Sequence, residues 1–195
     1  RKVLNITAPR RMAVLEPLKL VLVNMEPGHK EEVEVQNNPG DGNAGLRKLP
    51  LGRELWIERD DFMVEAPRKY FRLAPGRAVR LRGGYIVQYV DHVTDPESGE
   101  LTEVHCEYLP GTIGQSPPEG VVCKAAIHWV SVAEAEDAEV RLYDRLFHHE
   151  NPAAAEGGFF SVLNPDSLRI VTGAKLEPGL ASESAGFVCQ FERLG

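Results

Sequence analysis

The chain has few of the residues and segments that define several large protein classes. Its 195 residues include only three cysteines, Cys106, Cys123 and Cys189, which are widely spaced and form no CxxC pair. This spacing supports neither a zinc site nor a disulfide framework, and it predicts buried free thiols. No run approaches the ~20 apolar residues of a membrane helix, and the first residues lack the apolar core of a signal peptide. We therefore expect no membrane partner and a cytoplasmic location.

Motifs of common catalytic sites are also missing. The sequence contains no GxxxxGK[ST], HExxH or GxSxG pattern. The adjacent pair His148-His149 resembles a metal-binding pair, but neighbouring residues on a strand face opposite ways, so we expect a surface pair in a loop. No catalytic residue, metal site or cofactor is predicted in this chain.

Other polar clusters are assigned to the fold. Asp60-Asp61 and the acidic run at 134–139 are predicted to be solvated surface. His128-Trp129 lies within an apolar run and is predicted to be part of a core strand.

The 18 glycines and 14 prolines are spread along the chain as turn residues. Short alternating or apolar runs lie between them, and many short strands of this kind predict a barrel or sandwich, as one large or two small domains. Short helical turns are expected at 59–65, 131–136 and 157–163, and an exposed loop at 37–45. The expected strands are 19–23, 54–58, 78–82, 85–90, 102–108, 126–130, 140–143, 168–171 and 186–193.

Positive charge is concentrated in one region of a chain whose formal net charge is −7. Residues 66–90 contain no acid, although 29 Asp and Glu outnumber 22 Lys and Arg overall. Within this region, residues 68–82 hold six cations and two aromatics. A local excess of this kind indicates a negatively charged partner, because salt screens the more distant acidic residues within ~10 Å.

Strand alternation predicts how this basic region is arranged. Arg80 and Arg82 are expected on one face of a strand, and Tyr70 and Arg72 on one face of the preceding segment, with a turn at 75–76 between them. The resulting two-stranded platform suits unpaired RNA bases, which stack on guanidinium groups and accept their hydrogen bonds. The alternative is a solvated basic strand that keeps a sheet edge soluble.

Segments along the whole chain resemble, in colinear order, the anticodon-binding region of glutaminyl-tRNA synthetases. The RLYDRLF and IHWVS segments resemble bacterial glutaminyl enzymes more than the related glutamyl ones. The segments that carry the resemblance are 5–20, 55–62, 70–73, 79–82, 127–131, 139–147, 164–168 and 191–193.

The resemblance implies an all-β fold of two β-barrels, proximal and distal, with a few short helices, similar to the barrel of a 5S-rRNA-binding ribosomal protein. Both chain ends are expected to build the proximal barrel, from 1–24 and 124–195, while 25–123 builds the distal one. The family normally continues with closing strands after the FER segment at 191–193, so we expect those strands to be missing here.

The resemblance also implies which residues contact the anticodon. Phe71 departs from the family pattern, in which a lysine is common, and base stacking on Phe71 is one way to replace that lysine. Arg68 and Arg77 are expected to contact phosphate or solvent. The family roles fall on Arg10 and Gln190 for the middle base, Arg80 and Arg82 for the first base, Arg72 and Arg193 around the third, and Pro39 and Lys69 as further contacts.

The HIGH-type and KMSKS-type signatures of class I synthetases are missing, together with the domain that carries them. The resemblance therefore implies the anticodon-binding portion of a glutamine–tRNA ligase, whose catalytic domain would attach glutamine with ATP and Mg. The chain alone is expected to be inactive and monomeric, with the anticodon loop of tRNA(Gln) and that catalytic domain as partners. The alternative is a β-barrel module that binds structured RNA such as 5S rRNA.

Overall fold

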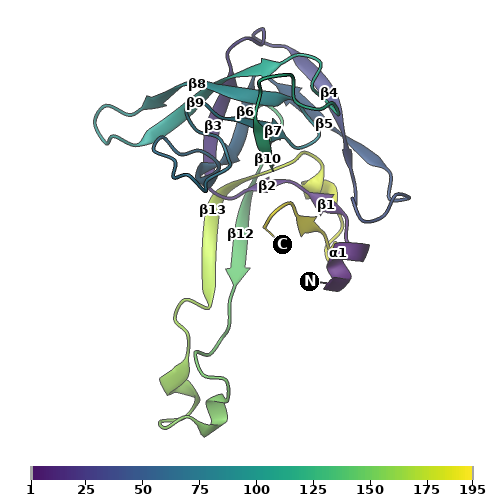
Figure 1. Ribbon diagram of the computed structural model, residues 1–195. Coiled ribbons are helices and arrows are strands. Elements are labelled where there is room, and N and C mark those ends of the chain that lie inside the picture. The colour runs from purple at the N-terminus through teal and green to yellow at the C-terminus, as the bar shows by residue number, and fades with distance from the viewer. Residues whose placement is uncertain (1, 195) are drawn as a thin grey trace.

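The computed structural model describes residues 2–194 and has an all-β architecture with a few short helices (Figure 1). The fold class expected from the sequence is confirmed. Residues 1 and 195, the outermost residues of the predicted proximal barrel, lie outside the described residues. The strands are β1 (Arg10–Arg11), β2 (Ala13–Val14), β3 (Pro17–Leu22), β4 (Lys30–Gln36), β5 (Leu46–Gly52), β6 (Glu54–Glu58), β7 (Ala78–Leu81), β8 (Ile86–Thr94), β9 (Leu101–Leu109), β10 (Cys123–Ile127), β11 (Val130–Ser131), β12 (Glu136–Tyr143), β13 (Leu168–Leu176) and β14 (Gln190–Phe191). The helices are α1 (Lys2–Thr7) and the short 3-10 turns η1 (Arg59–Asp61), η2 (Pro152–Ala154), η3 (Phe159–Val162) and η4 (Leu180–Ser182).

A curled seven-stranded sheet forms the body of the molecule, with strand order β10-β7-β8-β9-β3-β6-β11 (Figure 1). Alternation explains why these segments pair: in β7, Val79 and Leu81 are fully buried while Arg80 is only partly buried. Each fully buried large apolar side chain contributes about 1.5–3 kcal/mol relative to exposure. The core includes Leu18, Leu20, Leu22, Leu55, Ile57, Val79, Leu81, Val87, Val104, Ile127 and Trp129.

The β4–β5 hairpin packs beside this sheet and was not among the expected strands. Val33 and Val35 of β4 alternate with charged residues and are buried in the core, together with Leu49 and Leu51 of β5. Glu32 and Glu34, which flank Val33, face solvent, and this is the pattern of a strand with one buried face. The two valines are a period-2 signal, although too short to distinguish this segment from a charged loop.

The two ends of the chain lie together (Figure 1). β1 pairs in parallel with β14, so that Arg10 lies opposite Gln190, and β2 pairs with β13. Buried Glu177 fixes this region to the body, because its carboxylate accepts hydrogen bonds from the Met12 N–H (2.7 Å) and from the Arg47 guanidinium (2.7 and 2.9 Å). The predicted convergence of the chain ends is thus present in the strand pairing.

β12 and β13 extend away from the body as a long antiparallel arm (Figure 1). At the tip, 3-10 turns η2 and η3 pack against each other, and Phe147 forms an isolated bridge with Leu163. Several apolar side chains on this arm are exposed: Tyr143, Leu146, Phe159, Phe160, Leu168 and Ile170.

Several local expectations were wrong. Residues 70–72 form no strand, so the two-stranded basic platform does not exist. The expected strand at 186–193 is limited to Gln190–Phe191, and the expected helical turn at 131–136 is a strand end followed by a turn. For the 131–136 and 186–193 segments, pairing with distant strands overrode the local pattern, which propensity alone does not encode. The side chains of Tyr70 and Arg72 instead contact η1.

The prediction of buried free thiols was confirmed in full only for Cys106. The three cysteines are free, and Cys106 is buried while Cys123 and Cys189 are half-buried. Burial raises the pKa of all three thiols, so they remain protonated near neutral pH. Among residues 2–194 no helix is long and apolar enough to cross a membrane, and no His, Cys, Asp or Glu cluster could hold a metal ion.

Candidate nucleic-acid interface

The four residues Gln190–Arg193, called here the 190–193 segment, bring most of the predicted site residues together. The segment is held beside β1 by two backbone hydrogen bonds, from Gln190 N–H to Pro9 O (2.9 Å) and from Glu192 N–H to Arg11 O (2.8 Å). Gln190, Glu192 and Arg193 each have a different role in this arrangement.

Gln190 lies next to Arg10 and both side chains have unpartnered buried atoms. Gln190 is only 6% exposed, and its Oε1 has no hydrogen-bond partner within the described residues. Arg10 donates from Nη2 to Asn5 O (3.3 Å), but its buried Nη1 is likewise unpartnered among residues 2–194. A buried polar group without a partner costs about 1–3 kcal/mol. This pair therefore has one acceptor and one donor that remain unpaired within the described residues.

The exposed loop predicted at 37–45 is present and lies against the same region. The Arg10 N–H donates to Asn37 O (2.5 Å), and the buried Asn38 side chain donates to Ile6 O of α1 (2.6 Å). The Asn38 Oδ1 also accepts from the Gly40 N–H (2.9 Å), which fixes the turn around Pro39. Pro39 is thus exposed on a loop that is attached to the Arg10 strand.

Arg193 forms a two-pronged ion pair with buried Asp61. Arg193 Nη1 and Nη2 lie 2.5 and 2.6 Å from the two Asp61 carboxylate oxygens, and Arg72 Nη1 lies 3.3 Å from the same carboxylate. Asp61 is completely buried. Arg193 has a left-handed backbone (φ 66°), which costs a non-glycine residue about 1–2 kcal/mol. The carboxylate thus joins two predicted anticodon residues that are distant in sequence.

The sequence-based assignment of Asp61 to solvated surface was wrong. Asp60 is exposed as expected, but Asp61 is in η1, where its side chain turns inward. Its partner Arg193 lies 132 residues away. No local pattern signals such a pair, although an Asp-Asp pair followed by the apolar Phe62 is compatible with one inward acid.

Tyr70 and Arg72 also converge on η1. The Tyr70 hydroxyl and the Arg72 Nη1 each donate to Asp60 O (both 3.0 Å). Burial, followed by the negative charge of Asp61, raises the pKa of Tyr70 to about 12. Tyr70 is therefore a neutral donor at any physiological pH.

A small cavity of about 260 Å³ lies between these groups, and its lining includes Arg72, Arg193, Glu58 and His128. Glu58 accepts from the N–H groups of Leu15 (2.7 Å) and Glu16 (3.1 Å). Burial alone would raise the pKa of Glu58, but His128, whose Nε2 lies 3.4 Å from Glu58 Oε1, and the hydrogen bonds from these two N–H groups outweigh it and lower the pKa. Glu58 is therefore ionised at neutral pH.

His128 and Trp129 are both buried, as expected, but they lie between β10 and β11 and do not form part of a strand. Trp129 donates from Nε1 to Arg82 O (3.0 Å), which fixes the backbone at Arg82. Arg82 Nη2 in turn lies 3.3 Å from the carboxylate of Glu192, the third residue of the 190–193 segment. Thus Arg82, too, is connected to this segment.

Arg80 makes contacts that differ from those of the other predicted arginines. Its Nη1 and Nη2 donate to Thr112 O (2.6 Å) and Gln115 O (2.5 Å) in the loop after β9. Lys69 is exposed on the turn at 67–70 and has no ion-pair partner within residues 2–194. These two residues lie outside the contacts of the 190–193 segment.

Two family models match this chain, and both have the description "tRNA synthetases class I (E and Q), anti-codon binding domain". The first matches residues 8–109 and the second residues 126–195. The first model alone covers more than half of the chain. The chain belongs to this anticodon-binding domain family.

Curated relatives are named glutamine–tRNA ligase. The chain is 48% identical over 195 residues to the protein of Nitrobacter winogradskyi and 49% identical over 195 residues to that of Colwellia psychrerythraea. It is 50% identical over 197 residues to that of Rhodopirellula baltica. Each match covers 100% of this chain but only 34%, 35% and 32% of the respective relative. The chain thus spans about a third of the length of these relatives.

Within this anticodon-binding domain, the structure brings Arg10, Gln190 and Pro39 into one group and Arg72 and Arg193 into a second. The 190–193 segment belongs to both groups and also contacts Arg82. Sequence reasoning missed the side chains that hold the predicted arginines, which are Asp61, Glu192 and, at 3.4 Å from Arg193, His128.

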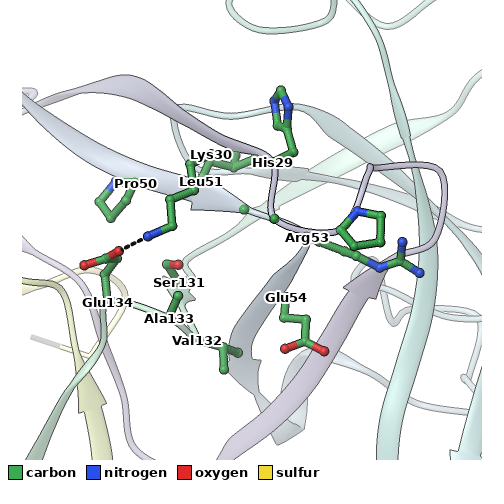
Figure 2. Close-up of a pocket in the computed structure, with 13 residues that line it drawn as sticks. His29, Lys30, Pro50, Leu51, Arg53, Glu54, Ser131, Val132, Ala133 and Glu134 are labelled. Carbon is green, nitrogen blue, oxygen red and sulfur yellow. Dashed lines mark hydrogen bonds and ion pairs between the residues drawn. The ribbon is translucent and has the colours of Figure 1, made fainter.

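A larger cavity of about 410 Å³ lies elsewhere, between β5 and the segment after β11 (Figure 2). Lys30 Nζ pairs with Glu134 across it at 2.6 Å, and none of the predicted anticodon residues lines it. Its charged lining residues are of both signs, so the cavity defines no ligand class.

Proposed function

We propose that this domain recognises the unpaired anticodon of glutamine tRNA for a glutamine–tRNA ligase. The observation that carries the proposal is the neighbouring pair of unpartnered atoms, Arg10 Nη1 and Gln190 Oε1, at the β1–β14 junction. The family match and the names of the relatives support the same reading.

The chemistry of this pair fits a uracil edge. Uracil presents an N–H donor flanked by carbonyl acceptors, while Gln190 offers an acceptor and Arg10 a donor. In duplex RNA that edge is paired, so recognition of this kind requires an unstacked base in a single-stranded loop. We assign Arg10 and Gln190 to the middle anticodon base.

The remaining predicted residues are assigned to the neighbouring bases and phosphates. Arg72 and Arg193 are assigned to the third base and Arg80 and Arg82 to the first. A guanidinium group has five N–H donors, so the arginines that are held by Asp61 and Glu192 still have free donors for RNA. Being fixed in advance, they lose less rotamer freedom on binding. Lys69 and Pro39 are assigned to further contacts.

We further infer the context of the domain in a longer protein. The ligase reaction, with ATP and Mg, belongs to a catalytic domain of the same polypeptide, so this chain alone is expected to be inactive. The exposed apolar side chains of the β12–β13 arm suit contact with that domain, and we propose a cytoplasmic monomer. We keep the division into a proximal barrel (1–24, 124–195) and a distal barrel (25–123) as a proposal, noting that β3 and β10 both belong to the seven-stranded sheet.

A binding experiment tests the assignment of the middle base. Anticodon stem-loops of glutamine tRNA with U or C at the middle position are titrated against the protein and Gln190→Met, which keeps the shape of the side chain but lacks its amide. The wild type is expected to prefer U by about tenfold or more, and Gln190→Met to lose most of this preference. Gln36→Met, on the exposed face of β4, is the control. Undiminished preference in Gln190→Met would contradict the assignment.

The same titration separates the alternative function. A module for structured RNA would bind 5S rRNA at least as tightly as the stem-loop and would be indifferent to the anticodon sequence. We expect the stem-loop to bind more tightly and with anticodon preference.

A further inference from the structure

A third pocket in this domain is lined by several cations and an aromatic ring. It has a volume of about 270 Å³ and lies between the 68–78 segment and the start of β10. The parallel pairing of β7 with β10, in which Ala78 lies opposite Cys123, brings these two segments together. The residues that line it are Arg68, Tyr70, Phe71, Gly76, Arg77, Ala78, Val122 and Lys124.

The charge of this lining is of one sign. Arg68, Arg77 and Lys124 are cations and no acid lines the pocket. Arg77 Nη2 makes a single hydrogen bond, to Pro67 O (3.3 Å), while Arg68 and Lys124 have no ion-pair partner within residues 2–194. The predicted anticodon arginines 72, 82 and 193 are all paired with carboxylates. The cations of this pocket are therefore available to an external anion.

An exposed aromatic ring stands beside these cations. Phe71 is 51% exposed, and Lys124 Nζ lies 5.4 Å from the centre of its ring. Val122, at the same side, is 67% exposed. An exposed Phe ring costs hydration free energy that a stacked base removes, and a cation placed next to the ring suits the phosphate attached to that base.

We propose that this pocket binds an unpaired nucleotide that flanks the bases recognised by the arginines, with its base on Phe71 and its phosphate between Arg68, Arg77 and Lys124. The proposal rests on the proposed function for the identity of the RNA. Tyr70 links the two sites, because its ring lines the pocket while its hydroxyl donates to Asp60 O beside Arg72.

The test uses the anticodon stem-loop of glutamine tRNA and an unstructured seven-nucleotide RNA, each titrated against the protein at several salt concentrations. Phe71→Ala is expected to weaken both interactions by about tenfold. Lys124→Gln is expected to weaken both and to reduce the slope of log affinity against log salt by about 0.7. Phe160→Ala and Arg145→Gln, at exposed residues of the arm tip, are matched side-chain changes and are expected to leave binding unchanged.

A photo-crosslink gives a readout that lost charge or lost stability does not mimic. 5-Iodouridine is placed in turn at each loop position outside the three anticodon bases, and the crosslinked peptide is mapped. A crosslink to the peptide that contains Phe71 is expected at one of these positions.

The outcomes separate the two proposals. Anticodon preference in the wild type, with unchanged binding by Phe71→Ala and Lys124→Gln, would overturn the pocket and keep the proposed function. If the wild type shows no anticodon preference but its affinity for the seven-nucleotide RNA depends on Phe71, the proposed function would be overturned and the pocket kept. Equal, Phe71-independent binding of a poly-glutamate peptide would show a general anion site and overturn the pocket as a nucleotide site.

Discussion

Four predicted arginines are held by groups of the protein itself, and this determines how single residues act in the site. Arg72 and Arg193 share Asp61, Arg82 pairs with Glu192, and Arg80 is held by backbone carbonyls. Side chains held in this way present a fixed pattern of donors. A change in a carboxylate that touches no RNA should therefore alter recognition.

Asp61→Asn tests whether such a carboxylate affects recognition, because Asp61 pairs with both Arg72 and Arg193. Removing one partner of a buried ion pair leaves the other charge unpaired, so we expect the free energy of unfolding to fall by about 3 kcal/mol. Affinity for the stem-loop should fall as well, because Arg72 and Arg193 lose their common anchor. Urea unfolding and the stem-loop titration measure the two effects. Asp60→Asn, at the exposed neighbour, is expected to change neither, and a loss below about 1 kcal/mol in Asp61→Asn would contradict the role given to the pair.

Glu58 makes the stability of the domain depend on pH. Because its pKa is lowered in the folded protein, its contribution is present above the unfolded value near 4.5 and is lost as pH falls through the folded pKa. At pH 7, Glu58→Gln should reduce the free energy of unfolding by about 1–2 kcal/mol, since one oxygen that accepts a backbone N–H becomes a donor. Urea unfolding from pH 7 to pH 3 should show that the difference in free energy of unfolding between the wild type and Glu58→Gln becomes smaller. A gap that widens on acidification would refute the assignment, and Glu54→Gln on the same strand is the control.

At this scale the sequence predicted what the side chains could offer, but not what holds them. Arg10 and Gln190 could be placed together because a family resemblance spans the whole chain. Asp61 could not be recognised as buried, since its partner lies 132 residues away and the acidic pair around it resembles ordinary surface. Contacts of this length depend on the completed fold, whereas local pattern reports only neighbours in sequence.

At the scale of single elements, the turn between β7 and β8 is closely packed against β4. Gly83 has φ +72°, and a Cβ there would lie 2.6 Å from Val35 Cγ2 and 3.3 Å from Glu34 O. The glycine is required both for the positive φ and for the close approach of this turn to β4.

Gly83→Ala is therefore expected to cost more than the same change at a roomier turn. Gly99 has a similar φ of +71°, but a Cβ there would meet no atom within 4 Å, so Gly99→Ala should cost only the strain of about 1–2 kcal/mol. For Gly83→Ala, overpacking against Val35 should lower the free energy of unfolding by roughly a further 1–3 kcal/mol. Urea unfolding of the two variants compares them directly, and equal losses would show that the contact with Val35 relaxes freely.

Prediction of the elements succeeded for segments with a clear apolar face and failed for strands that are very short or rich in charge. The strands later found as β3, β6, β7, β8 and β9 show alternating or apolar runs that bury one side. β4 was missed because its buried valines alternate with glutamates, and the strand at 186–193 was predicted too long because only two residues meet β1. The residues at which a strand begins and ends depend on its partner strand, which the local sequence does not specify.

At the scale of the molecule, the arm tip is connected to the rest of the protein through the ends of β12 and β13. Tyr143 pairs with Leu168 where the arm tip begins, and Asp144 N–H donates to Ser167 O at 2.9 Å. The contacts of the tip beyond this point are largely local.

Replacing residues 145–166 by Asn-Gly, which forms a type I′ turn, should therefore leave the body intact. We expect the free energy of unfolding to change by less than about 1 kcal/mol, because no buried contact of the body is removed. Stem-loop affinity should also stay within the range of the wild type. A non-cooperative urea transition, or loss of stem-loop binding, would show that the tip supports the body.

The all-β class was predictable from turn spacing and apolar alternation, while the convergence of the chain ends came only from the family resemblance. Composition indicates strands but gives no order for them. The order β10-β7-β8-β9-β3-β6-β11 includes parallel neighbours from distant parts of the chain, and such pairings have no signature in short segments.

The parallel pairing of β1 with β14 has a consequence during synthesis on the ribosome. Every strand of the seven-stranded sheet has been made once residue 131 is added, so that sheet can begin to fold while Gln190 and Arg193 are still to come. Until then Arg10 has no Gln190 beside it and Asp61 lacks its partner Arg193. A nascent or prematurely terminated chain that lacks residues 190–193 thus contains every strand of the sheet, but Arg10 and Asp61 are without the Gln190 and Arg193 that face them in the complete domain.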